Sequence, residues 1–168
     1  MLHINALIRP AVVTLAALAF SCGGQNPLGF TPVDTSQCPS GQKWTAGNTE
    51  SDLMQPGLDC VGCHVKEREG PRFSIAGTVY QDVATADACA GVSAISVVIT
   101  GADGKVLTLT SNEAGNFSSE AAVALPYMAK VVSTNGERAM GAAQTEGSCN
   151  ACHTPTGLQS APGRIMAP

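Results

Sequence analysis

The stretch Ser93–Thr110 (SAISVVITGADGKVLTLT) decides the fold class of this chain. Two runs rich in β-branched and apolar residues flank Gly101-Ala102-Asp103-Gly104, and an Asp-Gly pair between such runs is a strong turn signal. In the second run, Leu107 and Leu109 alternate with threonines, which is the period of a strand with one buried face. The stretch therefore predicts an antiparallel β-hairpin.

Similar β-rich runs lie on both sides of this hairpin, and none of them shows a sustained helical period. Asn135-Gly136 separates the last two runs and predicts a second hairpin. We therefore expect a mainly β fold, with a small antiparallel immunoglobulin-like sandwich over residues 73–141. Its expected strands are residues 73–80, 93–100, 105–110, 115–119, 127–133 and 137–140.

Turn glycines and core valines give this region a family resemblance. The residues that carry it are Gly77-x-Val79, Gly91-Val92, Val97-Val98, Gly104, Thr110, Gly115 and Phe117. Over residues 75–135 this pattern resembles the carboxypeptidase-regulatory-like sandwich family. The resemblance implies a scaffold or surface module, and it carries over no catalytic residue.

Two Cys-x-x-Cys-His motifs bracket the expected sandwich, Cys60-Val61-Gly62-Cys63-His64 and Cys149-Asn150-Ala151-Cys152-His153. Two thiols one helical turn apart match the two vinyl groups of a haem, and the adjacent imidazole can ligate its iron. The motifs predict two covalently bound haem c groups, attached through Cys60, Cys63, Cys149 and Cys152. His64 and His153 are the predicted proximal ligands. A four-thiolate zinc site and redox disulfides are the alternatives, but the motifs are too far apart for a zinc ribbon.

The distal iron ligands are constrained by counting. The chain has three histidines, and His3 falls in the expected leader, so bis-histidine ligation within one chain is excluded. Met54 and Met140 each lie shortly before a motif and are the predicted distal ligands, whereas Met128 is expected to pack in a strand and Met166 could reach either haem. Alternatively the methionines simply pack, and the iron is five-coordinate or completed by a partner.

The N-terminal residues 1–21 are expected to form a signal peptide, with the apolar run Ala11–Phe20 too short to span a bilayer. Cys22-Gly23-Gly24 resembles the start of a bacterial lipoprotein, which implies acylation of Cys22. The alternative is ordinary secretory cleavage before a free Cys22 thiol. We therefore expect an exported protein of the periplasm or cell surface, anchored to the outer membrane only through lipid.

Cysteine parity favours the lipoprotein reading. Four of the seven cysteines belong to the motifs, so Cys22, Cys38 and Cys89 remain. If Cys22 carries lipid, Cys38 and Cys89 are free to form one disulfide. Residues 22–37 are then a tether. Two irregular or short-helical haem-binding segments, residues 38–72 and 142–168, flank the sandwich.

An even number of alternating strands returns a chain to the end where it began, so six strands predict that both motifs lie at the same end of the sandwich. Two arginines near the motifs, Arg72 and Arg164, could each pair with a haem propionate or be solvated. Thirteen acidic residues against nine basic ones disfavour binding to nucleic acid.

Taken whole, the two motifs and the inserted sandwich resemble small dihaem c-type cytochromes of the bacterial cell envelope. The resemblance implies an electron carrier rather than an enzyme, with other redox proteins of the envelope as partners. Two alternatives stay open. One is a haem enzyme, or a gas- or peroxide-reactive protein, with an open iron position. The other is a surface assembly module whose haems are structural.

Overall fold

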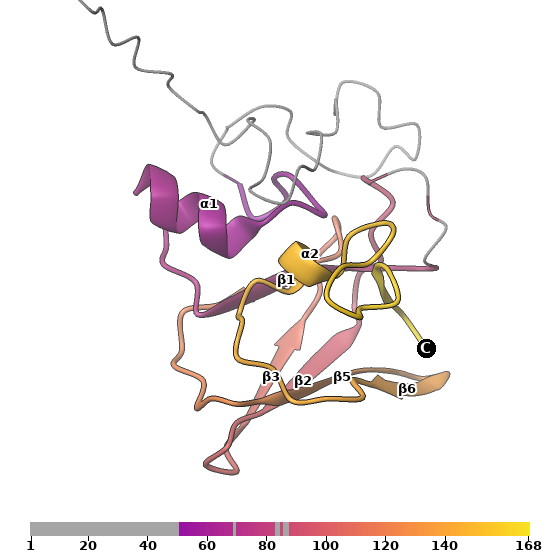
Figure 1. Ribbon diagram of the computed structural model, residues 1–168. Helices are drawn as coiled ribbons and strands as arrows, with labels where there is room; N and C mark the ends of the chain where they lie inside the picture. The colour runs from indigo at the N-terminus through magenta and orange to yellow at the C-terminus, as the bar shows by residue number, and fades with distance from the viewer. Residues whose placement is uncertain (1–50, 69, 83–84, 86–87) are drawn as a thin grey trace, which may run out of the picture.

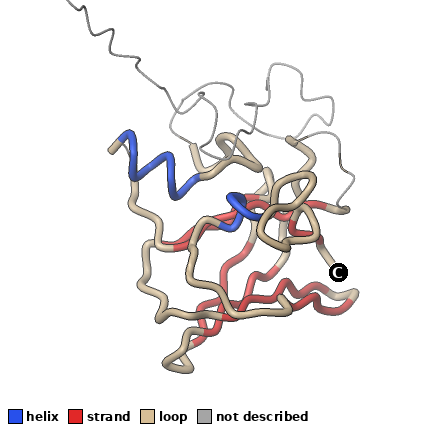
Figure 2. The backbone as a smooth tube through the Cα atoms, in the orientation of Figure 1, coloured by secondary structure: helices blue, strands red, loops and turns tan. Residues whose placement is uncertain are grey.

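The computed structural model describes residues 51–68, 70–82, 85 and 88–168 (Figure 1). Cys22, Cys38, the expected signal peptide and the expected tether lie outside these residues. Most regular structure is strand, and the two helices are short (Figure 2). The helices are α1 (Cys60–Glu67) and α2 (Cys149–Cys152), and the strands are β1 (Ile75–Tyr80), β2 (Ser96–Thr100), β3 (Val106–Thr110), β4 (Asn116–Ser119), β5 (Met128–Ser133), β6 (Gly136–Ala139) and β7 (Ile165–Met166).

The strands form two sheets. One has the order β3-β2-β5-β6 and is antiparallel throughout. The other has the order β4-β1-β7, in which β1 is antiparallel to β4 and parallel to β7. The predicted mainly β fold is confirmed, and so are both hairpins, since β2 pairs with β3 across the Asp-Gly turn and β5 pairs with β6 across the Asn-Gly turn.

One hydrophobic core joins the inner faces of the two sheets. Ile75, Val79 and Phe117 contribute to it from β1 and β4. Val97, Ile99 and Val131 contribute from β2 and β5. Alternate residues of these strands reach the core, as expected for a pleated sheet with one inward face.

Strand β1 is buried along its whole length, unlike the other strands. Ile75 and Val79 face the core, whereas Thr78 faces the motif helices and bonds to Asn150. In Figure 1 both helices lie on the side of β1 away from the four-stranded sheet. The core strand is therefore also the platform on which the two motifs lie.

Six strands separate the two motif helices, as the sequence predicted. The helices meet at their N-terminal ends, where Asn150 Nδ2 donates to Leu58 O at 2.8 Å. The two motifs therefore lie side by side, as predicted, but they lie against β1 rather than at an end of a sandwich. No helix among the described residues is long and apolar enough to cross a membrane.

Candidate functional site

The second motif is fastened along the edge of β1. Ala76 N donates to Gly147 O at 3.0 Å, just before the motif. Thr78 N donates to Asn150 Oδ1 at 3.1 Å, inside the motif. Beyond the motif, β7 continues along the same edge, and Ala167 N donates to Tyr80 O at 2.8 Å. The motif therefore takes the place of a strand partner for β1.

His153 follows α2 directly, and its ring has one nitrogen engaged. Nδ1 lies 2.8 Å from the carbonyl oxygen of Gly163, which is a hydrogen bond when that nitrogen carries the proton. In that tautomer Nε2 has a free lone pair. Ligating histidines commonly have this arrangement, because the bond to the carbonyl fixes the ring and increases its basicity.

The first motif repeats this arrangement. His64 Nδ1 lies 2.9 Å from the carbonyl oxygen of Pro71, and the ring of Phe73 packs 4.8 Å from the imidazole. The loop passes close to the ring at Gly70, where an added Cβ would lie 3.0 Å from His64 Cε1. Each predicted proximal ligand therefore has its Nδ1 engaged by a carbonyl of the segment that follows its motif.

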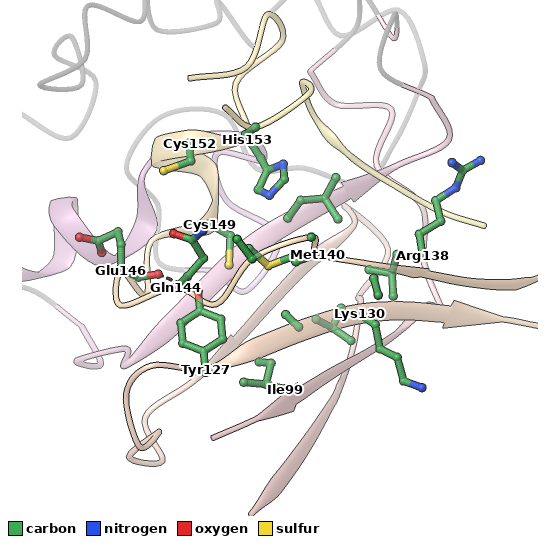
Figure 3. A pocket seen from close by; sticks show the side chains of 18 of the residues that line it. Ile99, Tyr127, Lys130, Arg138, Met140, Gln144, Glu146, Cys149, Cys152 and His153 are labelled. Carbon is green, nitrogen blue, oxygen red and sulfur yellow. Dashed lines mark hydrogen bonds between the residues drawn. The ribbon is translucent and has the colours of Figure 1, made fainter. Parts of the chain in front are cut away.

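A cavity of about 510 Å³ lies beside the second motif, bounded by α2, the four-stranded sheet and the C-terminal segment (Figure 3). Its walls include Cys149, Cys152 and His153. Its floor is apolar and includes Val97 and Ile99 from the core. The volume lies within the roughly 300–1,000 Å³ that is usual for small-molecule and cofactor pockets.

Two methionines line the same cavity as His153. The predicted distal ligand Met140 follows β6 and is held by a bond from its N–H to Ala129 O at 2.9 Å. Figure 3 shows the side chains of Met140 and His153 both extending into the cavity. Met166 reaches it from β7. The structure thus brings one imidazole and two thioethers to one apolar space.

Arg164 also lines the cavity, and its burial is unusual for a charged side chain. Only 5% of it is exposed, and its Cζ lies 4.1 Å from the centroid of the Tyr80 ring. Nε and Nη1 have no hydrogen-bond partner among the described residues. A solvated surface position, one of the two possibilities that its sequence left open, is wrong for this residue.

The free motif thiols are poor nucleophiles in this structure. Burial raises the pKa of the Cys149 thiol to about 12. Burial, with the nearby Asp59 carboxylate, raises the pKa of Cys60 to about 12. Burial and Glu146 also raise the pKa of Cys152. Reactive redox cysteines have lowered pKa values, so the described thiols do not resemble a dithiol catalyst.

The remaining sequence-predicted residues are less closely gathered. Cys63 is disulfide-bonded in this structure, so a thioether at this position requires that disulfide to open. Cys89 is fully buried and disulfide-bonded, whereas Cys38 lies outside the described residues, and their pairing stays a prediction. Met54 O accepts from Asn116 Nδ2 at 3.0 Å, which holds the turn against β4. The described contacts do not join Met54 to His64.

Sequence reasoning missed the polar joint between the motifs. The Asp59 carboxylate accepts from Gly62 N at 2.7 Å and from the Ser148 hydroxyl. Asn150, of which 2% is exposed, donates to Leu58 O and to Thr78 Oγ1. Asn150 occupies a spacer position of its motif, where haem attachment sets no residue type, so the motif pattern holds no signal for this role.

The described residues contain no group of three or more His, Cys, Asp or Glu side chains arranged to hold a metal ion. Among them, the thiols of the two motifs therefore do not converge as a zinc site would require. No family model matches the chain, and no curated protein or solved structure shows significant similarity to it.

Proposed function

We propose that this chain is a dihaem c-type cytochrome that relays electrons in the bacterial cell envelope. One haem c is attached at Cys60 and Cys63 and ligated by His64; the other is attached at Cys149 and Cys152 and ligated by His153. One observation carries the proposal. An apolar cavity beside the second motif is lined by both thiols, by an imidazole with its Nδ1 engaged, and by two thioethers.

The residues at the second motif fit a haem in four respects. The lining is largely apolar, the thiols and His153 enter from one wall, and thioethers are available as a sixth ligand. In addition, two nitrogens of the buried Arg164 have no hydrogen-bond partner among the described residues. Bound haem would supply a one-electron ferrous–ferric couple. The protein would orient it through Gly163 O, which fixes the His153 ring, and would exclude water with its apolar floor.

Met140 is the proposed distal ligand of the second haem, with Met166 as the competing thioether, because both line the cavity that His153 also lines. Met54 is kept as the proposed distal ligand of the first haem on its place in the sequence. Methionine–histidine ligation raises the reduction potential and gives a low-spin iron that has no open position for substrate.

Relay between the two haems is supported by the contact between the motif helices. The Ser148 hydroxyl donates to Asp59, and Asn150 donates to Leu58 O, so the two attachment segments are joined directly. Groups attached to joined segments are held at a fixed separation. This arrangement suits electron exchange between them, with other redox proteins of the envelope as the outer partners.

The two-sheet core is proposed to be an immunoglobulin-like sandwich of the carboxypeptidase-regulatory-like kind, acting as a scaffold. Acylation of Cys22, export and an outer-membrane location complete the proposal. The net charge of −4 supports protein partners over nucleic acid.

The test is to produce the full chain in a host competent for c-type haem maturation and to measure its intact mass and visible spectra. We expect the mass of two haems and low-spin spectra in both oxidation states. A Cys149→Ala/Cys152→Ala variant should lose one haem, whereas the control Cys89→Ser should keep both.

A chain that matures without haem, or that binds zinc in its place, contradicts the proposal. A high-spin iron whose spectrum shifts with carbon monoxide or peroxide contradicts the carrier role and favours the enzyme. Intact mass also reports acylation of Cys22, independently of the haem count.

A further inference from the structure

We propose that Arg164 binds a propionate of the haem at the second motif and raises the reduction potential of that haem. The inference rests on the proposed function, because it concerns a group that the proposed cytochrome would carry. It goes further by assigning a positioning residue that the Cys-x-x-Cys-His pattern does not contain.

The guanidinium of Arg164 is buried and lacks partners for two of its nitrogens among the described residues. Arg164 is 5% exposed, yet its Nε and Nη1 have no hydrogen-bond partner among the described residues. A buried charge without a partner is strongly unfavourable, and a buried arginine is normally paired with an anion. The ion pairs among the described residues join Lys66, Lys105 and Lys130 to carboxylates, and Arg164 is in none of them.

The surroundings hold Arg164 in place before any ligand arrives. Its guanidinium stacks 4.1 Å from the centroid of the Tyr80 ring, and the Tyr80 hydroxyl donates to Ala88 O at 2.9 Å. The next residue, Ile165, begins β7 and pairs with Val79 of β1. A guanidinium that stacks on an aromatic ring, on a backbone fixed by strand pairing, loses little entropy when it binds an anion.

The position of Arg164 beside the second motif indicates which anion it binds. Arg164 lines the cavity that Cys149, Cys152 and His153 line, and the neighbouring Gly163 carbonyl is the partner of His153 Nδ1. Gly163 thus holds the imidazole that would ligate the iron. Arg164, the next residue, would pair with an acidic group at the edge of the same haem. Haem carries two carboxylates on an otherwise apolar ring, which matches one buried cation in an apolar cavity.

The expected effect on the potential follows from charge. A propionate anion stabilises ferric iron over ferrous iron, because the ferric state has one more positive charge. An arginine paired with that propionate cancels part of the effect and favours reduction. The step is a one-electron reduction by an external donor.

The experiment is an optical redox titration of the mature holoprotein, with wild type compared with Arg164→Gln and Arg164→Lys. We expect both variants to keep two haems by mass. In Arg164→Gln the reduction equilibrium of one haem should shift at least tenfold toward the ferric state. This shift corresponds to a fall in potential of about 59 mV or more for one electron. Arg164→Lys, which keeps the charge, should shift less.

A single-haem form, Cys60→Ala/Cys63→Ala, assigns the shift to the second haem. The matched control is Arg72→Gln, since Arg72 is an exposed arginine near the first motif. It should leave the potential of the second haem unchanged. If Arg164→Gln does not mature, resonance Raman spectra of wild type and Arg164→Lys report the hydrogen bonding of the propionates directly.

Each outcome has one meaning. Two attached haems with an unmoved potential in Arg164→Gln, or unchanged propionate bands in Arg164→Lys, overturn the role of Arg164 and leave the cytochrome intact. A loss of thermal stability without a shift in potential means that Arg164 only packs on Tyr80. Absence of haem from the wild type overturns the proposed function itself.

Discussion

At the scale of single residues, the two motif histidines share one local arrangement although they lie in different loops. His64 Nδ1 faces Pro71 O, and His153 Nδ1 faces Gly163 O. The carbonyl follows the histidine by seven residues in the first case and by ten in the second. Loops of different length thus hold both rings by Nδ1. This indicates that both histidines must keep Nε2 free for the same purpose.

Asn150 is the residue whose replacement should destabilise the motif joint most. Asn150→Ala removes the acceptor for Thr78 N, in a buried setting, and the donor to Leu58 O, in a partly buried one. Leaving such groups unpaired costs about 1–3 kcal/mol each, so we expect a loss of roughly 2–4 kcal/mol in the free energy of unfolding. Denaturant unfolding followed by circular dichroism measures it.

The equivalent spacer of the first motif provides the control for that prediction. Val61 is only partly buried, and Val61→Ala should cost well under half as much. Equal losses in the two variants would mean that Asn150 acts through helix content rather than through its amide.

The Cys149 thiol supplies a prediction that depends on pH. Burial raises its pKa to about 12, so at pH 8.5 the folded, haem-free protein holds it almost wholly protonated, whereas an ordinary thiol of pKa about 8.5 is half ionised. Alkylation by iodoacetamide should therefore be about three orders of magnitude slower than in the denatured chain. Its rate should keep rising up to pH 12.

Mass spectrometry of peptides from a pH series tests this prediction, with denatured protein as the reference. A Cys149 that reacts in the native protein as fast as in urea, with its rate levelling off near pH 9, would show that its thiol is exposed to solvent.

At the scale of elements, the sequence was a good guide wherever structure is local. The two hairpins follow from Asp103-Gly104 and Asn135-Gly136, because such turns set the pairing of the strands beside them. Strand β7 was not predicted. It has two residues and pairs in parallel with β1, about 85 residues earlier in the chain, so no local period marks it.

Strand β1 should tolerate no side chain at Gly77. A Cβ there would lie 2.6 Å from Phe117 Cζ and 2.9 Å from Cys149 Cβ. Gly77→Val must therefore displace the ring or the first cysteine of the second motif, and overpacking of this kind costs about 1–3 kcal/mol. We expect a lower midpoint of thermal unfolding and a reduced yield of the second haem.

Gly141 is a suitable control for this substitution, because a Cβ there has no neighbour within 4 Å. Gly141→Ala should leave both haem yield and unfolding temperature unchanged. If Gly77→Val matures as fully as wild type, Cys149 does not depend on close packing against β1.

At the scale of the whole molecule, the core and the candidate site are one space. Val97, Ile99 and Val131 belong to the hydrophobic core and also line the cavity beside the second motif. The chain has only seven aromatic residues, so haem would add apolar bulk to the core, but the sequence does not indicate where. The location depends on long-range packing of α2 against the sheets, which local patterns do not encode. For the same reason the burial of Arg164 and the joint at Asn150 were not predictable.

This shared space predicts that the two haems contribute unequally to stability. Loss of the second haem, in Cys149→Ala/Cys152→Ala, leaves the 510 Å³ cavity open against core side chains. Unfilled apolar cavities are destabilising, and partial collapse should still leave a loss of about 3 kcal/mol, or roughly 6–12 °C in unfolding temperature for a domain of this size. Loss of the first haem, in Cys60→Ala/Cys63→Ala, removes a group beside α1, in which no residue is fully buried, so its cost should be smaller. Thermal unfolding of the two single-haem proteins in the ferric state decides between them, with haem number verified by mass. Equal midpoints would mean that the sheets close over the cavity when it is empty, and that the second haem lies against the core without forming part of it.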